Sequence, residues 1–203
     1  MYFHGMITNI NQLDLNGSYN YADYLTWQFE EYVELIRGRI YRMPPAPSRK
    51  HQRVASNLHL IIAPAFRGNP CDVYFAPFDV RLLDRKKSAK SNRDILTVVQ
   101  PDICVICDRS KLDDAGCLGA PDWIIEILSA GSQRKDRKDK LQLYEENGVR
   151  EYWIVSPFDD DVAVYLLDDQ GQYRLTGLYS DDDEVPCGIL PGLSIPVPKI
   201  FAE

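Results

Sequence analysis

The sequence contains no long apolar run. Its apolar stretches fall well short of the roughly 18 residues that a membrane-spanning helix needs. The start, MYFHGMITNI, also lacks the charged-then-apolar layout of a secretory signal. With 203 residues, 45% of them hydrophobic and 26% charged, we expect one soluble, cytoplasmic globular domain over residues 1–203.

Cysteine is scarce, and its number is odd. Five cysteines in a chain of this size argue against a disulfide framework and predict reduced thiols in a reducing compartment. Cys104 and Cys107 have the spacing of half a zinc site, but both fall in an expected strand, where positions three apart face opposite ways. Cys117 and Cys187 stand alone, so we do not expect zinc.

Acidic residues are absent between Leu35 and Cys71, although the net charge of the chain is −7. Of the 23 bases, 18 lie in three segments, which run from Arg37 to Arg67, from Arg81 to Arg93 and from Arg134 to Lys140. A protein with one basic face can bind a phosphate backbone despite an acidic total charge. Solvated basic surfaces that happen to cluster are an equally good interpretation.

The N-terminal half predicts a helix, a hairpin and a second helix. We expect a short helix over residues 20–30 and a tight hairpin centred on Arg37 and Gly38. Ser48 is a good N-cap for a helix over roughly 49–66. On this helix His51 shares a face with Val54 and the later apolar positions, so its side chain is expected to point inward.

The remaining chain predicts mainly strands. We expect strands at 72–83, 101–107, 122–128 and 151–156, an exposed loop at 84–94, and a closing hairpin over VAVYLL and QYRLTGLY. A helix at 133–146 should end at Asn147 and Gly148. The proline-punctuated tail, LPGLSIPVPKIF, is expected to lie over the surface.

Two carboxylates interrupt expected buried strands. Asp102 lies in PDICVIC and Glu126 in PDWIIEILS. Ionised carboxylates are costly in such places unless a cation meets them. Their oxygens, with the backbone carbonyl of Ile127, are suitable ligands for Mg²⁺, or for Mn²⁺.

The helix that follows Glu126 has a polar face. Asp136, Lys140 and Tyr144 are spaced by four residues each and therefore share one side of the helix. If this side faces Glu126, Lys140 is placed to assist a metal-activated water in attacking a phosphodiester. The alternative is a surface ion pair between Asp136 and Lys140, which would contribute little.

Several motifs together carry a resemblance to a known family. They are VELIRGRI, PPAPSRKHQRVASNL, FDVRL, QPDICVI, PDWIIEILSAGS, DRKDKLQLY and NGVREYWIVSP. Over about residues 20–200 the chain resembles the Uma2 family, formerly a domain of unknown function and described as restriction-endonuclease-like, within the PD-(D/E)XK nuclease superfamily.

The resemblance implies an α/β (α+β) fold with a restriction-endonuclease-like core of helix, three strands, helix and strand. It also implies that Asp102 and Glu126 bind the metal. Glu34 and His51 align with a glutamate and a histidine typical of the family and become candidates for the rim of the site, with Glu34 in a catalytic role. A hairpin-face charge for Glu34 and a core position for His51 remain open alternatives.

One position departs from the superfamily pattern. Leu128 occupies the place, two residues after Glu126, where the superfamily's name requires lysine. Lys140 is the substitute we expect, as in branches whose lysine has moved to the following helix. Leu128 also motivates the alternative of an inactive, nuclease-like module that binds nucleic acid or a protein partner.

These observations together predict a Mg²⁺-dependent endonuclease acting on DNA, with RNA a less favoured substrate. Its nucleic-acid contacts are expected at Arg49, Lys50, His51, Arg134 and Lys135. A homodimer is expected because cutting both strands requires two sites. An enzyme acting on another phosphate-bearing small molecule is a further alternative.

Overall fold

The computed structural model describes residues 6–43, 47–83, 91–132 and 134–203. Its larger sheet has the strand order β12-β11-β10-β9-β6-β3. These strands are β3 (Asp72–Phe75), β6 (Ile103–Ile106), β9 (Trp123–Ile127), β10 (Glu151–Ser156), β11 (Asp161–Leu167) and β12 (Tyr173–Tyr179). β9 and β10 are parallel, whereas all the other neighbours in this sheet are antiparallel.

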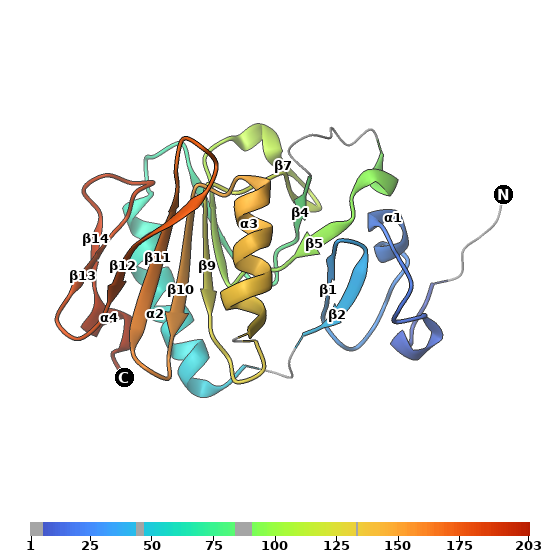
Figure 1. The fold of residues 1–203 in the computed structure, drawn as a ribbon, viewed down its shortest axis with the longest axis horizontal. Helices are drawn as coiled ribbons and strands as arrows, with labels where there is room; N and C mark the ends of the chain where they lie inside the picture. Colours follow the sequence, from blue (N-terminus) through green and yellow to red (C-terminus); the bar gives the residue numbers. More distant parts are fainter. Residues whose placement is uncertain (1–5, 44–46, 84–90, 133) are drawn as a thin grey trace.

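Helices cover both faces of the larger sheet (Figure 1). Helix α2 (Arg49–Ala65) packs its buried side chains, Val54, Leu58 and Ile62, against one face. Helix α3 (Leu141–Asn147) packs Leu143 and Tyr144 against the other. Successive strand residues point to opposite faces, so the same strands supply apolar side chains to the cores under both helices. The core of helix, three strands, helix and strand expected from the sequence is confirmed by α2, β3, β6, β9, α3 and β10.

A second sheet lies on the α3 side, with the order β2-β1-β5-β4-β8-β7. Its strands are β1 (Val33–Ile36), β2 (Arg39–Arg42), β4 (Val80–Leu82), β5 (Thr97–Val99), β7 (Leu112–Asp113) and β8 (Gly116–Leu118). The β1–β2 hairpin turns through Arg37 and Gly38, at φ 50° and 80°. Two positive φ angles are typical of the tight hairpin turn that the sequence predicts, and Gly38 is needed because a Cβ there would lie 2.6 Å from Ser18 Oγ.

Helix α2 begins as predicted. Ser48 Oγ accepts a hydrogen bond from His51 N at 3.2 Å, which satisfies one of the free N–H groups of the first turn. The helix includes Pro64 in its last turn and runs to Ala65. His51 is buried, as the apolar face predicts.

The single strand predicted at 72–83 is wrong. This segment forms β3 in the larger sheet and β4 in the second, separated by residues that include a cis peptide bond between Ala76 and Pro77. Proline has no N–H for a strand ladder, so the break at Pro77 was visible in the sequence. The expected loop 84–94 lies outside the described residues at 84–90, and a short 3-10 helix follows at Asn92–Asp94.

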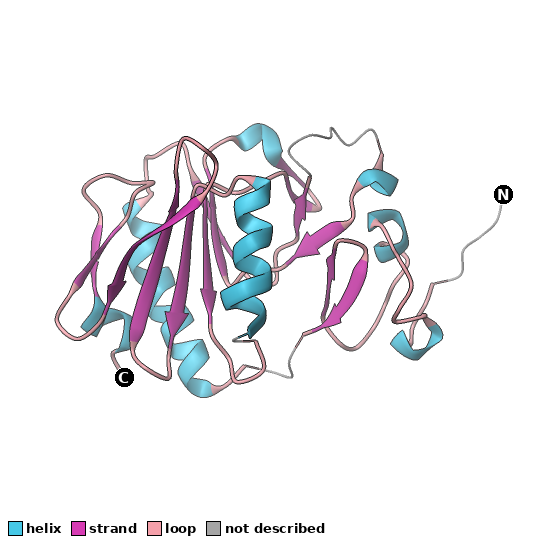
Figure 2. Ribbon diagram, in the orientation of Figure 1, coloured by secondary structure: helices cyan, strands magenta, loops and turns pink. Residues whose placement is uncertain are grey.

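Two further predictions need correction. The helix expected over 20–30 is only α1 (Tyr21–Tyr24), which Asn20 caps. The C-terminal tail does not lie over the surface: β14 (Ser194–Pro196), paired with β13 (Glu184–Pro186), and α4 (Val197–Phe201) bury Ile195 and Ile200 in the core beside α2. Its apolar residues belong to the same core cluster as those of α2, and Figure 2 shows α4 beside α2.

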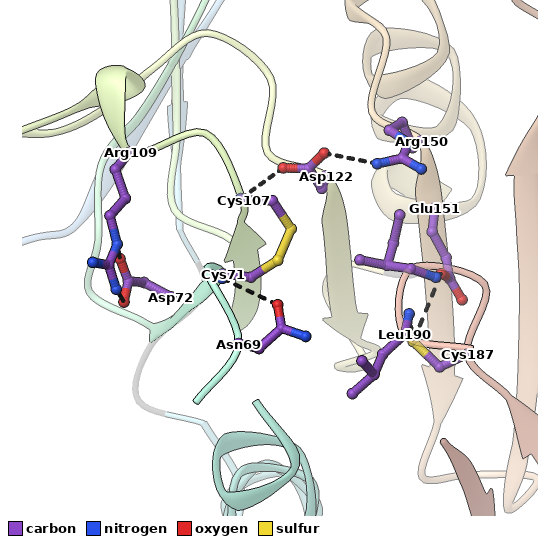
Figure 3. Close-up of a disulfide and its surroundings, with 11 residues drawn as sticks. Asn69, Cys71, Asp72, Cys107, Arg109, Asp122, Arg150, Glu151, Cys187 and Leu190 are labelled. Carbon is purple, nitrogen blue, oxygen red and sulfur yellow. Dashed lines mark hydrogen bonds and ion pairs between the residues drawn. A yellow bond between two sulfur atoms is a disulfide. The ribbon is translucent and has the colours of Figure 1, made fainter. Parts of the chain in front are cut away.

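The prediction of reduced thiols is wrong for two of the five cysteines. Cys71 and Cys107 form a disulfide (Figure 3). They lie 36 residues apart in the chain. Their sequence neighbours Asp72 and Ile106 are paired between β3 and β6, and this pairing brings the two cysteines together. Cys104, Cys117 and Cys187 are free and buried.

Candidate active site

Lys140 is the centre of a buried polar cluster between the two sheets. Its side chain is only 4% exposed. Lys140 Nζ lies 2.7 Å from Glu126 Oε1 and 2.9 Å from Glu34 Oε1. The lysine thus joins a strand of the larger sheet, β9, to a strand of the second, β1.

An unusual helical segment brings Lys140 inward. Lys135–Lys140 forms a π-helix that continues directly into α3, in place of the uninterrupted helix expected at 133–146; residue 133 lies outside the described residues. Such π segments are frequent at functional sites. The following helix ends where predicted, with Gly148 at φ 88°.

The polar face predicted for this helix is turned toward Glu126. Asp136, Lys140 and Tyr144 are all buried, and Asp136 Oδ1 lies 3.8 Å from Lys140 Nζ. Burial raises the pKa of Asp136. The alternative of a surface ion pair between Asp136 and Lys140 is therefore wrong.

Glu34 is buried and paired with two lysines. It accepts hydrogen bonds from Lys135 and Lys140, and from Gln100 N at 3.1 Å. Burial alone would raise its pKa, but the ammonium groups of Lys140 and Lys135 outweigh burial and lower the pKa of Glu34 to about 2. Glu34 is therefore not an ordinary charge on an exposed hairpin face.

The pKa of Glu126 is shifted in the opposite direction to that of Glu34. Burial raises the pKa of Glu126 to about 8, although Lys140 opposes the shift. Tyr144 donates a hydrogen bond to Glu126 Oε1 at 2.6 Å, and Lys140 bonds the same oxygen. Because Glu34 shares the Lys140 ammonium, one lysine serves two carboxyl groups.

Asp102 lies beside Glu126, directly before β6. Asp102 Oδ2 accepts a hydrogen bond from Ile127 N at 2.7 Å, so this acid is fixed to the residue that follows Glu126. His51 Nε2 lies 3.5 Å from the same oxygen. Burial alone would lower the pKa of His51, but Asp102 outweighs it and the pKa is raised. The start of α2 is thereby held against the start of β6.

The cluster has more acidic than basic groups. Three carboxyl groups, those of Glu34, Glu126 and Asp136, lie around the Lys140 ammonium, and Lys135 also contacts Glu34. A fourth, that of Asp102, lies against His51. In the parts of the chain that the structure describes, no three His, Cys, Asp or Glu side chains are arranged as a ready metal-binding group. In this structure the ammonium groups of Lys140 and Lys135 are the cations that these acids contact.

Part of the basic charge on the first segment is paired with acids, and further bases there are hydrogen-bonded to neutral oxygens. Arg37 pairs with Glu146, Arg39 bonds the carbonyl oxygen of Gly17 at 3.1 Å, and Arg42 bonds Asn11 Oδ1 at 3.1 Å. Farther along, Lys50 pairs with Asp160 at 2.9 Å. Charge clustering in the sequence therefore overstates the free basic surface.

The other expected nucleic-acid contacts differ in exposure. Arg49 and Arg134 are exposed, whereas Lys135 is half-buried and bound to Glu34. His51 is buried against Asp102. Of the other basic residues in the second segment, Arg85, Lys86, Lys87 and Lys90 lie outside the described residues.

Two partners of the site were missed by sequence reasoning. Lys135 was expected to contact nucleic acid, yet it forms an ion pair with Glu34. This pair becomes apparent only in the fold, which brings β1 close to the π-helix. Gln100, which directly precedes the PDICVI motif, donates its backbone N–H to Glu34. Gln100 is part of the motif QPDICVI, but the sequence alone does not indicate that its backbone N–H bonds Glu34.

A family model described as "Putative restriction endonuclease" matches residues 21–198 of the chain. The chain belongs to the Uma2 family. This membership supports a nuclease-like function. The matched region includes all residues of the buried cluster, from Glu34 to Tyr144.

Two similar proteins accompany the family match. An uncharacterized protein of Synechocystis sp. is 22% identical over 163 residues, which is 79% of this chain and 80% of that protein. A crystal structure from Anabaena variabilis, titled as a putative nuclease belonging to DUF820, has a TM-score of 0.67 and 20% identity. It covers 90% of this chain and 97% of the other, and the likeness shows a shared fold.

The Uma2 chain departs from the superfamily motif for a structural reason. Leu128 is 1% exposed and packs in the core cluster with Leu143 and Tyr144. A lysine at this position would bury an ammonium among apolar side chains, which is costly. Lys140, in contrast, reaches Glu126 from the helix.

Proposed function

We propose that this chain is a Mg²⁺-dependent endonuclease that hydrolyses phosphodiester bonds of DNA. The observation that carries the proposal is the buried Lys140 ammonium, bonded to Glu126 at 2.7 Å beside Asp102. In this proposal Asp102 and Glu126 would hold the metal and the ammonium would lie beside it, an arrangement suited to metal-assisted phosphodiester hydrolysis. Membership of the Uma2 family supports the same reaction class.

The donor set fits a hard divalent cation. Carboxylate oxygens are the ligands that Mg²⁺ and Mn²⁺ prefer, and the cluster carries an excess of carboxyl groups over ammonium groups. The hydrogen bonds that Lys140 and Tyr144 make with Glu126 both go to Oε1, which leaves Oε2 for a metal. Asp102 and Glu126 would hold the ion, which when bound lowers the pKa of a water and shields charge on the phosphate.

The residues of the chain have distinct roles in this proposal. Tyr144 and Lys140 orient the Glu126 carboxylate through Oε1. Lys140 places a positive charge where negative charge grows on the phosphate oxygens. Glu34 holds Lys140 from the other side, at 2.9 Å, and so fixes the ammonium in position.

The DNA backbone would be bound by exposed bases around the site. Arg49 begins α2 and Arg134 precedes the π-helix, and both are exposed. Such contacts with phosphates supply affinity that falls as salt rises. We propose that two copies of the chain act together, since cutting both strands requires two sites.

The experiment is cleavage of supercoiled plasmid DNA by the purified chain in Mg²⁺, Mn²⁺ or EDTA. We expect cleavage in either metal and none in EDTA. Asp102→Asn and Glu126→Gln keep the side-chain shape and should each abolish cleavage, while Lys138→Met, at an exposed position of the same helix, should leave it unchanged. Equal cleavage by either acid variant and the wild type would contradict the proposal.

A second candidate function is an inactive module that binds nucleic acid or a protein partner. It is favoured by the state of Lys140, whose ammonium is engaged by Glu34 and Glu126, and by the absence of lysine at Leu128. Salt-dependent binding of DNA without turnover in either metal would support this candidate over the endonuclease.

A further inference from the structure

A half-exposed tyrosine lies next to the buried cluster. Tyr41, on β2, is directly opposite Glu34 on β1. Opposite residues of an antiparallel pair point to the same face, with their Cβ atoms about 5 Å apart. Glu34 is buried against Lys140, whereas Tyr41 is 37% exposed. The tyrosine therefore marks the point where the buried cluster meets solvent.

Lys135 fixes the Tyr41 ring. Its ammonium lies 5.1 Å from the ring centroid and is also bound to Glu34. This is the geometry of a cation–π contact, which orients the ring and leaves its exposed part available. The ring is thus held in place without being covered.

Tyr41 has cationic neighbours on its own strand. Arg39 donates to the carbonyl oxygen of Gly17 and Arg42 to Asn11 Oδ1, and because both acceptors are neutral the two exposed guanidinium groups keep their charge. β2 is the edge strand of its sheet, so an extended ligand can approach the hairpin without displacing another strand of that sheet. This edge therefore presents an aromatic ring, held by Lys135, on a strand that also carries two cations.

We infer that Tyr41, positioned by Lys135, is a stacking platform for a nucleobase next to the phosphate at the Lys140 cluster. The inference rests on the proposed function and deepens it, because it assigns the residue that holds a base. Stacking of a base on an aromatic side chain tolerates any sequence, since every base has a π-face. The ligand class is therefore single-stranded or locally unstacked nucleic acid, held without reading its sequence.

The test compares two fluorescently labelled single-stranded oligonucleotides, one normal and one in which several central nucleotides are abasic. Both have the same phosphate charge, so any difference in affinity reports base contacts. Binding is measured by fluorescence anisotropy in Ca²⁺ with the wild type, Tyr41→Phe and Tyr41→Ala. Thermal unfolding confirms that each variant is folded.

We expect the wild type and Tyr41→Phe to bind the normal oligonucleotide about tenfold more tightly than the abasic one, the scale of one stacked base. Tyr41→Ala should bind both alike, at the lower affinity. Equal affinity of the wild type for both, or a preference that Tyr41→Ala retains, would overturn the platform.

Cleavage of the plasmid in Mg²⁺ separates this inference from the proposed function. Metal-dependent cleavage with no base dependence in binding overturns the platform and leaves the endonuclease standing. Base-dependent binding that Tyr41→Ala abolishes, together with no cleavage by the wild type, supports the platform and overturns the endonuclease.

Discussion

Lys140 and Glu126 form a buried pair, with Nζ and Oε1 2.7 Å apart and both side chains about 5% exposed or less. The pair joins the helix after β9 to β9 itself, 14 residues apart in the chain. Burial alone would lower the pKa of Lys140, but Glu126 and Glu34 outweigh it and raise the pKa well above its usual value. The lysine is therefore charged, and it is the cation around which the acids are arranged.

Loss of this cation should destabilise the fold. Lys140→Met removes the ammonium but keeps most of the side-chain volume, leaving Glu34 with only Lys135 as a cation. Breaking a buried pair by removing one partner costs about 3–5 kcal/mol, and we expect the free energy of unfolding in urea to fall by about 3 kcal/mol. Lys138→Met, at an exposed position, should change it by no more than about 0.5 kcal/mol. Equal effects of the two variants would show that the buried ion pairs contribute little.

The high pKa of Glu126 should make stability depend on pH in metal-free buffer. Its pKa is about 8 in the folded chain against an ordinary value of 4.5. Between these values the folded state holds a proton that the unfolded state has lost, so a rise in pH favours unfolding. The contribution of Glu126 is fully present below about pH 4.5 and is lost as pH rises to about 8.

Urea unfolding of the wild type and of Glu126→Gln, from pH 5 to pH 8 in EDTA, checks this sign. The stability of the wild type should fall relative to that of the variant as pH rises, because glutamine does not titrate. Glu34 acts in the opposite sense at lower pH, since its pKa is lowered to about 2. A difference between the two proteins that grows in favour of the wild type would contradict the assignment of the proton to Glu126.

The sequence predicted the parts of the fold that depend on local patterns. The apolar face of α2 and its Ser48 cap, the β1–β2 hairpin and the stop at Gly148 each rest on residues close together in the chain. The acids Asp102 and Glu126 were noticeable because an ionised group in an apolar strand needs a partner.

What the sequence could not give was the contact between distant segments. Glu34 lies on β1 and Lys140 at the end of the π-helix before α3, and no local pattern shows that they meet at 2.9 Å. The break between β3 and β4 at Pro77 was visible, but not that the two strands join different sheets. The odd number of cysteines hid the pairing of Cys71 with Cys107, which depends on the register of β3 with β6.

The disulfide gives a prediction that is independent of the site. Closing a loop of 36 residues restricts the unfolded chain and should stabilise the fold by about 4 kcal/mol in the chain-entropy model. The double variant Cys71→Ser, Cys107→Ser should lower the free energy of unfolding by roughly this amount.

Thiol titration of the denatured, non-reduced protein provides the direct check. It should find the free thiols of Cys104, Cys117 and Cys187, and the remaining two only after reduction. All five cysteines reacting without reductant, in protein purified under air, would contradict the disulfide.

Binding of Mn²⁺ to the wild type and to Asp102→Asn, measured by isothermal titration calorimetry at pH 8, tests the central claim most directly. The account predicts that the wild type binds Mn²⁺ at the acid cluster. Asp102→Asn should stay folded, because its amide oxygen still accepts the hydrogen bond from Ile127 N, but should lose this binding. Equal Mn²⁺ binding by the two proteins, or none by the wild type, would contradict a metal site at Asp102 and Glu126.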